Sequence, residues 1–324
     1  MIMVGKIIAA LVWAFWIMAM STAEGNPADQ VAISEPVKKE YSPTYSSTFD
    51  RVKKRGYVIC GTNDEFPGFS QENWGNEEGN RWKGFDVDIC RAVAVAVFGH
   101  SDDIEFTVVN GKTRFEFLID GSIDILSAAT TFTYTRNVAK KLEFMPTTYY
   151  DGQGFIVRKT LGVSSAKQME GARICFSGTG TAAKNIADFM ELHGIHYIPV
   201  AVKPTEKTKN VYKRGDCDMY GTDRSGLASN RLSFADPDRH MILPEIISKE
   251  PLGPVVRYGD QKWTDVIRWT VYVLFIAEEM GINSKKSAMF FAAVPVELKH
   301  IFAPSSCFAE DTPRVFLTIN PCPS

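Results

Sequence analysis

The sequence predicts an α/β fold of two lobes, each a central, mostly parallel sheet flanked by helices, joined by two hinge strands. Between residues 49 and 126, short apolar segments alternate with amphipathic or alanine-rich segments. This order of strands and helices is typical of a parallel sheet covered on both faces. Two similar extended phrases, residues 149–159 and 251–260, bracket a further stretch of the chain. They indicate a chain that leaves one lobe, forms a second lobe and returns.

The individual elements follow from apolar runs and from the turn residues between them. In the first lobe we expect helices at residues 49–55, 89–98, 114–119 and 263–280, strands at 57–61, 104–109 and 125–126, and a surface hairpin at 71–83. In the second lobe we expect a strand at residues 172–176, a tight turn at 177–181, a helix at 182–192 and a short strand ending near residue 223.

The ends of the chain are expected to lie outside these lobes. Lys6, an apolar run at residues 7–20 and the small residues up to Ala23 predict a signal peptide, with a retained membrane anchor as the alternative. The predicted parts are therefore a signal peptide (1–23), a flexible segment (24–48), the first lobe (49–150 and 248–284), the second lobe (151–247) and an atypical C-terminal tail (285–324).

Composition restricts the classes of partner. The chain has 324 residues, 45% of them hydrophobic, and a formal net charge of -2. Its length allows two domains, and its charge argues against a nucleic-acid partner. The short basic run at residues 53–55 is typical of a solvated helix end.

Six cysteines follow the predicted signal peptide: Cys60, Cys90, Cys175, Cys217, Cys307 and Cys322. An exported chain meets an oxidising compartment, where cysteines pair, and none of these has the spacing of a zinc or redox motif. We expect Cys60 to pair with Cys90 and Cys175 with Cys217, so that each bridge closes a loop within one lobe. The pairing of the last two stays open.

A polar stretch ends the short strand at residues 125–126 and marks the first candidate site. Thr130, Thr131 and Thr133 precede Arg136, whose planar guanidinium can bind a carboxylate through two hydrogen bonds. In an open α/β sheet, ligands bind at this carboxyl edge of the strands. Alternatively, Arg136 lies on a solvated first helical turn, capped by Thr133 or Thr135.

The second lobe repeats this pattern. The glycine-bearing turn at residues 177–181 precedes a helix, and free amides at a helix N-terminus suit an anion. A simple strand-to-helix turn is the alternative. Asp223 ends a short strand and is opposite in charge to Arg136; it would either bind a ligand cation or cap the following turn. Together the two charges would suit a ligand with a carboxylate and an ammonium group.

Three other features have weaker functional interpretations. Asp86 and Asp88 precede a helix, where a cap is expected rather than a metal site. Phe66 and Phe69 lie on a bend, and either ring covers a ligand or packs within its own lobe. None of the five histidines, His100, His193, His196, His240 and His300, falls in a predicted cleft loop, so no catalytic residue is assigned.

Several phrases together resemble family 3 of the solute-binding proteins of ABC importers, especially its general L-amino-acid-binding members. They are residues 84–88, 130–136, 149–155, 177–179, 217–223 and 243–254. The resemblance covers about residues 49–284 and stops near Lys285, where the family continues with further helices.

The resemblance implies a monomeric periplasmic protein without cofactor or metal, which captures L-amino acids and delivers them to an ABC permease. It implies that Arg136 binds the ligand carboxylate and Asp223 the ammonium group. The other implied ligand-binding residues are Asn63, Phe66, Ala129, Thr131, Gly178, Thr179 and Thr222. The rival hypotheses are a dehydratase-like enzyme on the same fold and a sensory domain, which would need a following membrane span.

Overall fold

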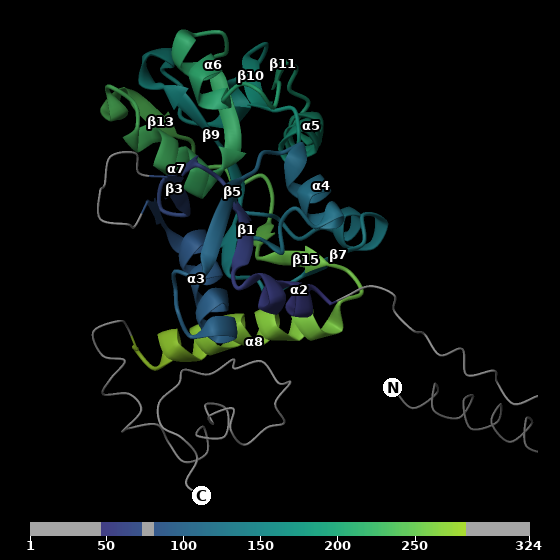
Figure 1. The fold of residues 1–324 in the computed structure, drawn as a ribbon. Coiled ribbons are helices and arrows are strands. Elements are labelled where there is room, and N and C mark those ends of the chain that lie inside the picture. Colours follow the sequence, from purple (N-terminus) through teal and green to yellow (C-terminus); the bar gives the residue numbers. More distant parts are fainter. Residues whose placement is uncertain (1–46, 73–80, 283–324) are drawn as a thin grey trace, which may run out of the picture. The chain divides into compact units, whose positions relative to one another are not determined.

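The computed structural model describes residues 47–72 and 81–282, all within one unit of the chain, Tyr45–Ser324 (Figure 1). The predicted signal peptide, nearly all of the predicted flexible segment and the predicted tail lie outside these residues. So do Cys307, Cys322 and His300. No helix of the described ranges is long and apolar enough to cross a membrane.

The first five-stranded sheet has the order β5-β1-β6-β15-β7. Its strands are β1 (Val58–Thr62), β5 (Ile104–Val108), β6 (Ile125–Leu126), β7 (Leu142–Phe144) and β15 (Val255–Arg257). β1 pairs in parallel with β5 and β6, whereas β15 runs antiparallel to β6 and β7. The accompanying helices are α2 (Thr48–Arg55), α3 (Phe85–Phe98), α4 (Thr113–Asp120) and α8 (Gln261–Glu279). Strand β15 thus brings a late part of the chain back into the sheet that begins with β1.

The second five-stranded sheet has the order β11-β10-β12-β9-β13. Its strands are β9 (Gln153–Arg158), β10 (Arg173–Ser177), β11 (Ile198–Val202), β12 (Met219–Asp223) and β13 (His240–Ile242), and its helices are α5 (Ala182–Leu192), α6 (Thr208–Arg214) and α7 (Arg224–Leu232). β10, β11 and β12 are parallel, and β9 is antiparallel to its neighbours. All strands of this sheet come from residues 153–242, within the predicted second lobe.

The two hinge phrases begin in an antiparallel pair of strands, β8 (Tyr149–Asp151) with β14 (Glu250–Leu252). A small sheet of β2 (Glu65–Phe66), β3 (Ser70–Glu72) and β4 (Trp82–Lys83) contains the expected hairpin. Short helical turns at Thr135–Ala139, Lys159–Leu161, Ala166–Gln168 and Pro237–Arg239 complete the described elements. The boundaries between the two lobes remain a prediction.

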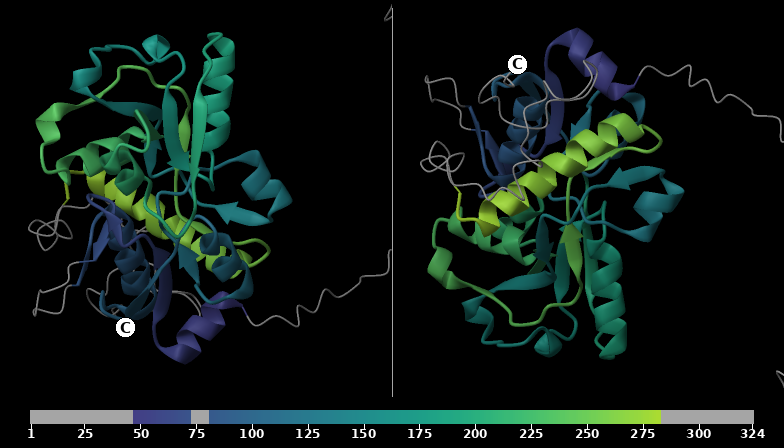
Figure 2. Two further views of the ribbon diagram at one scale, coloured as in Figure 1. Left: turned by 90° about the horizontal axis from the view of Figure 1, so that it is seen from above. Right: turned by 90° about the horizontal axis from the view of Figure 1, so that it is seen from below.

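Side chains of successive strand residues point to opposite faces of a sheet. In both large sheets, each face is covered by an apolar cluster. In the first sheet, Ile125 and Val256 pack in one apolar cluster with α3 and α8, while Leu126 and Val255 pack in another with α4. The second sheet alternates in the same way. Burial of both faces explains why these strands are continuous apolar runs in the sequence. Figures 1 and 2 show α8 beside α2 and α3 on one side of the first sheet, and these three helices pack together.

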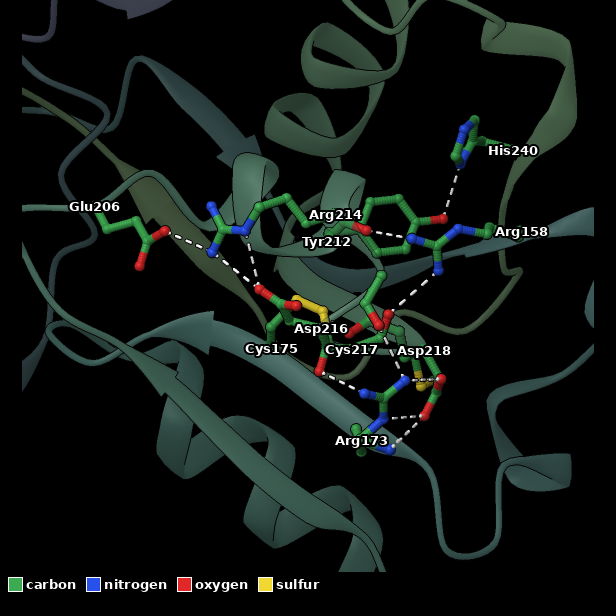
Figure 3. Close-up of a disulfide and its surroundings, with 12 residues drawn as sticks. Arg158, Arg173, Cys175, Glu206, Tyr212, Arg214, Asp216, Cys217, Asp218 and His240 are labelled. Carbon is green, nitrogen blue, oxygen red and sulfur yellow. Dashed lines mark hydrogen bonds and ion pairs between the residues drawn. A yellow bond between two sulfur atoms is a disulfide. The ribbon is translucent and has the colours of Figure 1, made fainter.

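Both predicted disulfide bonds are present. Cys60–Cys90 joins β1 to α3, and Cys175–Cys217 joins β10 to the turn before β12. All four cysteines are fully buried. Figure 3 shows that ion pairs surround the second bridge, including Arg173 with Asp218 at 2.8 Å, so the bridge lies in a region that is also held by charged side chains.

Removing the second bridge should destabilise the protein markedly. The two cysteines are 42 residues apart, and a cross-link of this span restricts the unfolded chain. We expect Cys175→Ala with Cys217→Ala to lower the free energy of unfolding by about 2–4 kcal/mol. Denaturant titration of the oxidised wild type and the double variant measures this difference. Equal midpoints, or free thiols at both positions in the native wild type, would count against the bridge.

Candidate functional site

The segment after β6 places the first candidate residues at the carboxyl edge of the first sheet. Ser127, Thr130 and Thr131 are buried, and Ala129 between them has a φ of 45°. A positive φ costs a residue with a Cβ about 1–2 kcal/mol, so the surrounding structure must hold this turn in place. Strained backbone of this kind is concentrated at functional sites.

Asp86 holds this turn. Its carboxylate accepts hydrogen bonds from the Ser127 Oγ at 2.8 Å and from the Ala129 amide at 2.9 Å. Burial raises the pKa of Asp86 to about 6, although both hydrogen bonds and Arg114 favour the charged form. The predicted cap role is wrong, because α3 begins earlier than expected and Gly84 occupies its N-cap position. The described residues also contain no cluster of acidic, histidine or cysteine side chains able to hold a metal.

Arg136 lies in the helical turn that follows. Its amide donates a hydrogen bond to the Thr133 Oγ1 at 3.3 Å, as the capping alternative expected, but its side chain is half-buried rather than solvated. Nη1 donates to the Thr131 carbonyl at 2.6 Å, and the guanidinium carbon lies 5.2 Å from the centre of the Phe115 ring. Burial lowers the pKa of Arg136, and the opposing charges of Glu250 and Asp223 limit this effect.

Arg114 is a second half-buried cation beside the same turn, and the sequence prediction did not include it. From the first turn of α4, its Nη1 donates to the Ala128 carbonyl at 3.2 Å and the Thr130 Oγ1 at 3.3 Å. Burial, and then repulsion by Arg136, lowers the pKa of Arg114 to about 10. Two guanidinium groups close together form a region that favours an anion. The available signal was the position of Arg114 just after a parallel strand, at the same sheet edge as Arg136.

Asp223 ends β12 and occupies the N-cap position of α7. This is the position that the capping alternative expected, but within the described part of the chain the Asp223 side chain makes no capping hydrogen bond to α7. Instead, the Ser225 amide donates to Asp151 Oδ2 at 3.3 Å. The pKa of Asp223 is raised to about 7, mainly by burial and to a smaller extent by repulsion from Glu250 and Asp151. The positive charges of Arg136 and Arg114 act to lower it. The two predicted charges, from different sheets, therefore lie within electrostatic range of each other.

Asp151 and Glu250 face each other across the pair of hinge strands. Glu250 is almost fully buried, and its carboxylate accepts hydrogen bonds from the Asn185 Nδ2 at 2.6 Å and the Ser248 Oγ at 2.7 Å. It also accepts one from the Thr181 Oγ1 at 3.3 Å. The sequence prediction assigned no role to either acid. Asp151 lies in the first hinge phrase and Glu250 directly precedes the second, at the corresponding place, and this correspondence was the signal.

The remaining predicted residues lie where loops of the two sheets meet. Gly111, after β5, lies so close to Thr179 that an added Cβ would be 1.9 Å from the Thr179 Oγ1. Gly180 lies beside Arg136, because an added Cβ there would be 3.9 Å from the Arg136 Nη2. The turn at Gly178 is fixed by a hydrogen bond from its amide to the Val202 carbonyl at 2.8 Å. The glycine turn before α5 thus adjoins Arg136.

The rings of Phe66 and Phe69 differ in how deeply they are buried. Phe69 is buried and packs against Phe66, with ring centres 4.6 Å apart. Phe66 is only partly buried, and its ring would lie 3.7 Å from a Cβ at Gly226, which would also be 3.4 Å from the Thr222 methyl group. Asn63, directly after β1, is partly buried. Within the described ranges, Asn63 makes no hydrogen bond or ion pair with the charged residues.

Ion pairs also join the start of β2 to the start of α6, apart from Arg136 and Asp223. Lys207 contacts Glu65 and lies 3.3 Å from Asp64, and Lys209 lies 2.5 Å from Glu65. Burial acts to raise the pKa of Glu65, but hydrogen bonds from Lys207 and Lys209 outweigh it and lower the pKa. We call these four residues the charge latch.

Comparison with known proteins identifies the family. The sequence model of the bacterial extracellular solute-binding proteins, family 3, matches residues 58–290. The chain belongs to this family. Its general fold is therefore the two-lobed fold of periplasmic binding proteins, as the sequence predicted.

Two curated relatives of this solute-binding protein are similar over most of their length. The general L-amino acid-binding periplasmic protein AapJ of Rhizobium johnstonii is 48% identical, over 75% of this chain and 70% of the relative. The glutamate/glutamine/aspartate/asparagine-binding protein BztA of Rhodobacter capsulatus is 45% identical, over 74% and 69%. Among solved structures, a periplasmic binding protein from Brucella ovis with glutathione bound has a TM-score of 0.75 at 41% identity, covering 80% of each chain.

Proposed function

We propose that this solute-binding protein holds an L-amino acid between Arg136 and Asp223 and delivers it to the membrane permease of an ABC importer. The observation that supports this most is that two half-buried, opposite charges from different sheets lie within electrostatic range of each other. Arg136 binds the α-carboxylate, with the backbone of Thr131 and Thr179. Asp223 binds the α-ammonium group, with the carbonyl of Ala129. The names of the relatives AapJ and BztA agree with an amino-acid ligand.

The electrostatics of the site without ligand favour a zwitterion. Arg114 and Arg136 repel each other, as do Asp223, Asp151 and Glu250. A carboxylate placed beside the arginines and an ammonium group placed beside the acids relieve both repulsions. Charge-assisted hydrogen bonds of this kind contribute about 1.5–3 kcal/mol each.

Selectivity for the ligand side chain rests on a mixed set of residues. Asn63 and Phe66 line the side-chain pocket from the first sheet, and Thr222 and the turn at Gly178 line it from the second. Phe66 and Thr222 present apolar and small groups to it. Because no charged residue of this set selects one side chain, we propose broad specificity. Relatives with different named ligands, such as BztA, agree with a variable pocket.

We also propose where the protein acts in the cell and in which form. The chain is exported to the periplasm, its signal peptide is cleaved near Ala23, and the mature protein is a monomer that needs no cofactor. We propose no catalytic role; among the described histidines, His240 hydrogen-bonds Tyr212 and His196 hydrogen-bonds Glu170.

Titration calorimetry of the mature protein against the twenty L-amino acids tests this function. We expect several L-amino acids with different side chains to bind with dissociation constants of about 1 μM or below. If only one of the twenty L-amino acids gives a heat of binding, the proposed broad specificity is wrong. If no L-amino acid binds, the proposed ligand class is wrong.

The charge latch should strengthen binding by favouring the arrangement in which the two sheets approach. A ligand that contacts both lobes shifts the protein toward that arrangement. We expect Lys207→Ala with Lys209→Ala to weaken amino-acid binding about 3- to 10-fold at low salt. The difference should nearly vanish at about 1 M salt, because exposed charges are then screened. Lys184→Ala, which removes an ion pair within α5, is the matched control. A salt-independent loss would contradict the latch.

A further inference from the structure

A buried polar network joins the hinge strand β14 to the start of α5. Glu250, the first residue of β14, is 2% exposed. Its Oε1 accepts hydrogen bonds from the Asn185 Nδ2 at 2.6 Å and the Ser248 Oγ at 2.7 Å, and its Oε2 accepts one from the Thr181 Oγ1 at 3.3 Å. All three donors are neutral side chains, so they hold the carboxylate in place without cancelling its charge.

Gln153 connects this network to the strand that ends in Asp223. The two residues are paired in the register of β9 and β12. The Gln153 side chain is fully buried, and its Oε1 accepts a hydrogen bond from the Asn185 Nδ2 at 2.9 Å. Its amide donates to the Ser248 Oγ at 3.0 Å. The same two side chains bond Glu250, so the network fixes this hinge acid relative to the end of β12.

Asp151, on the other hinge strand, is a second acid with a similar task. It faces Glu250 in the register of β8 and β14. Its Oδ2 accepts hydrogen bonds from the amide and the hydroxyl of Ser225, at the start of α7. Each hinge acid therefore holds the start of one helix of the second sheet. These helices, α5 and α7, follow the glycine turn and Asp223, which are the two parts of the second sheet in the proposed site.

Charged groups from four elements act on Asp223. They are Glu250 on β14, Asp151 on β8, Arg136 in the turn Thr135–Ala139 and Arg114 on α4. Negative neighbours favour the protonated form of a carboxyl group, and positive neighbours favour the ionised form. Of the two repulsions, that of Glu250 is the larger. Burial raises the pKa of the Tyr220 hydroxyl, so this neighbour on β12 stays neutral. Glu250 is thus the main charged group that opposes ionisation of Asp223.

We propose that Glu250 is a positioning residue of the amino-acid site: near neutral pH its buried charge keeps a proton on Asp223 until the ligand ammonium group arrives, and capture of the amino acid then releases that proton. This inference rests on the proposed function, because it needs an ammonium group beside Asp223. The proton passes from the Asp223 carboxyl group to the solvent, and the carboxylate that remains pairs with the ligand cation. The charge of Glu250 sets the pH below which the amino acid is held less tightly.

Glu250→Gln tests the charge alone, because an amide can keep the same network. Its oxygen can accept hydrogen bonds from Asn185 and Ser248, and its nitrogen can donate one to the Thr181 hydroxyl. Carbon-13 NMR of side-chain carboxyl groups in the ligand-free protein follows the titration of Asp223, which the spectrum of Asp223→Asn assigns. We expect the midpoint of this titration to lie about one pH unit lower in Glu250→Gln than in the wild type.

Glu245→Gln is the matched control for this substitution. Glu245 is half-buried and accepts a hydrogen bond from the Ser165 Oγ, but it is not one of the charged groups that act on Asp223. The same chemical change at this position should leave the Asp223 midpoint where it is in the wild type. Thermal unfolding of both variants shows whether each keeps its fold.

Calorimetry in buffers of different ionisation enthalpy measures proton release on binding and needs only the wild type. The ligand is L-glutamine, whose side chain does not titrate, or the neutral L-amino acid that binds most tightly if L-glutamine gives no heat. Because the pKa of Asp223 is about 7 without ligand, the wild type at pH 7 should release about half a proton per bound molecule. Glu250→Gln should release about a tenth of a proton.

Three results overturn the proposal: binding without proton release in the wild type, an unchanged Asp223 midpoint in Glu250→Gln, or an equal fall of this midpoint in Glu245→Gln. A different result identifies failure of the proposed function. If the midpoint moves as expected but none of the twenty L-amino acids binds, the proposed ligand class is wrong and the coupling of proton release to capture fails with it.

Discussion

Arg136→Ala is expected to weaken binding of a neutral L-amino acid by at least about 2 kcal/mol, or about 30-fold. The substitution removes the proposed partner of the ligand carboxylate, which then enters a buried region without its two hydrogen bonds. Arg114 remains nearby and, freed from repulsion by Arg136, offsets part of the loss. Calorimetry at one pH and salt concentration measures the change in dissociation constant.

Two further variants separate charge from geometry. Arg136→Lys keeps the positive charge but loses the planar fork, so its affinity should lie between those of the wild type and Arg136→Ala. Arg239→Ala removes an exposed arginine of the second sheet layer and should leave affinity unchanged. Thermal unfolding of each variant shows whether loss of the Thr131 hydrogen bond weakens the fold. Wild-type affinity in Arg136→Ala would remove this residue from the site.

Asp223→Asn is expected to weaken binding by at least about 2 kcal/mol above pH 7, and by less as the pH falls. Without ligand, the pKa of Asp223 is raised to about 7, so the wild-type carboxylate is partly protonated at neutral pH. The ligand ammonium group favours the ionised form, and binding therefore releases a proton below pH 7. The wild-type affinity should fall about tenfold per pH unit there. The variant has no such group to titrate.

The raised pKa of Asp223 makes the ligand-free fold less stable as the pH rises, whereas it makes ligand binding tighter. Because the folded pKa of Asp223 lies above the unfolded value of 3.8, this residue stabilises the ligand-free fold below pH 4, and that contribution is lost as the pH rises through 7. Asp223→Asn should therefore unfold at a higher temperature than the wild type above pH 7. Asp86, with a pKa of about 6, titrates in both proteins and serves as the common background.

A control acid distinguishes the site from general charge effects. Asp188→Asn alters an exposed carboxylate on α5 that pairs with Lys184, and its binding should keep the wild-type pH dependence. If Asp223→Asn retains the same pH dependence as the wild type, the titrating group is elsewhere and the proposed role of Asp223 fails.

The sequence was sufficient where the determining interactions are local or periodic. Continuous apolar strands alternating with helices predicted the mostly parallel sheets, and both faces of each sheet are indeed covered. The polar residues after β6 and at the end of β12 were placed at strand ends, as the sheet geometry requires. The two disulfides followed from loops closed within one lobe.

The sequence was insufficient where a long-range contact overrides a local preference. An aspartate beside a helix start normally caps it, but Asp86 instead binds the Ala129 amide, 43 residues away in the chain. Similarly, Asp223 is at a cap position, and Asp151, from a hinge strand, supplies the hydrogen bond to α7. Neither pairing leaves a local pattern, because each depends on how distant strands meet.

Calorimetry with charge-deleted ligands tests the central proposal most directly. For one L-amino acid that binds the wild type, we compare its decarboxylated amine and its N-acetyl derivative, which each lack one of the two charges. Both should bind at least about 30-fold more weakly, since each leaves either Arg136 or Asp223 without its partner. If either derivative binds as tightly as the parent amino acid, the ligand is not held between these two charges.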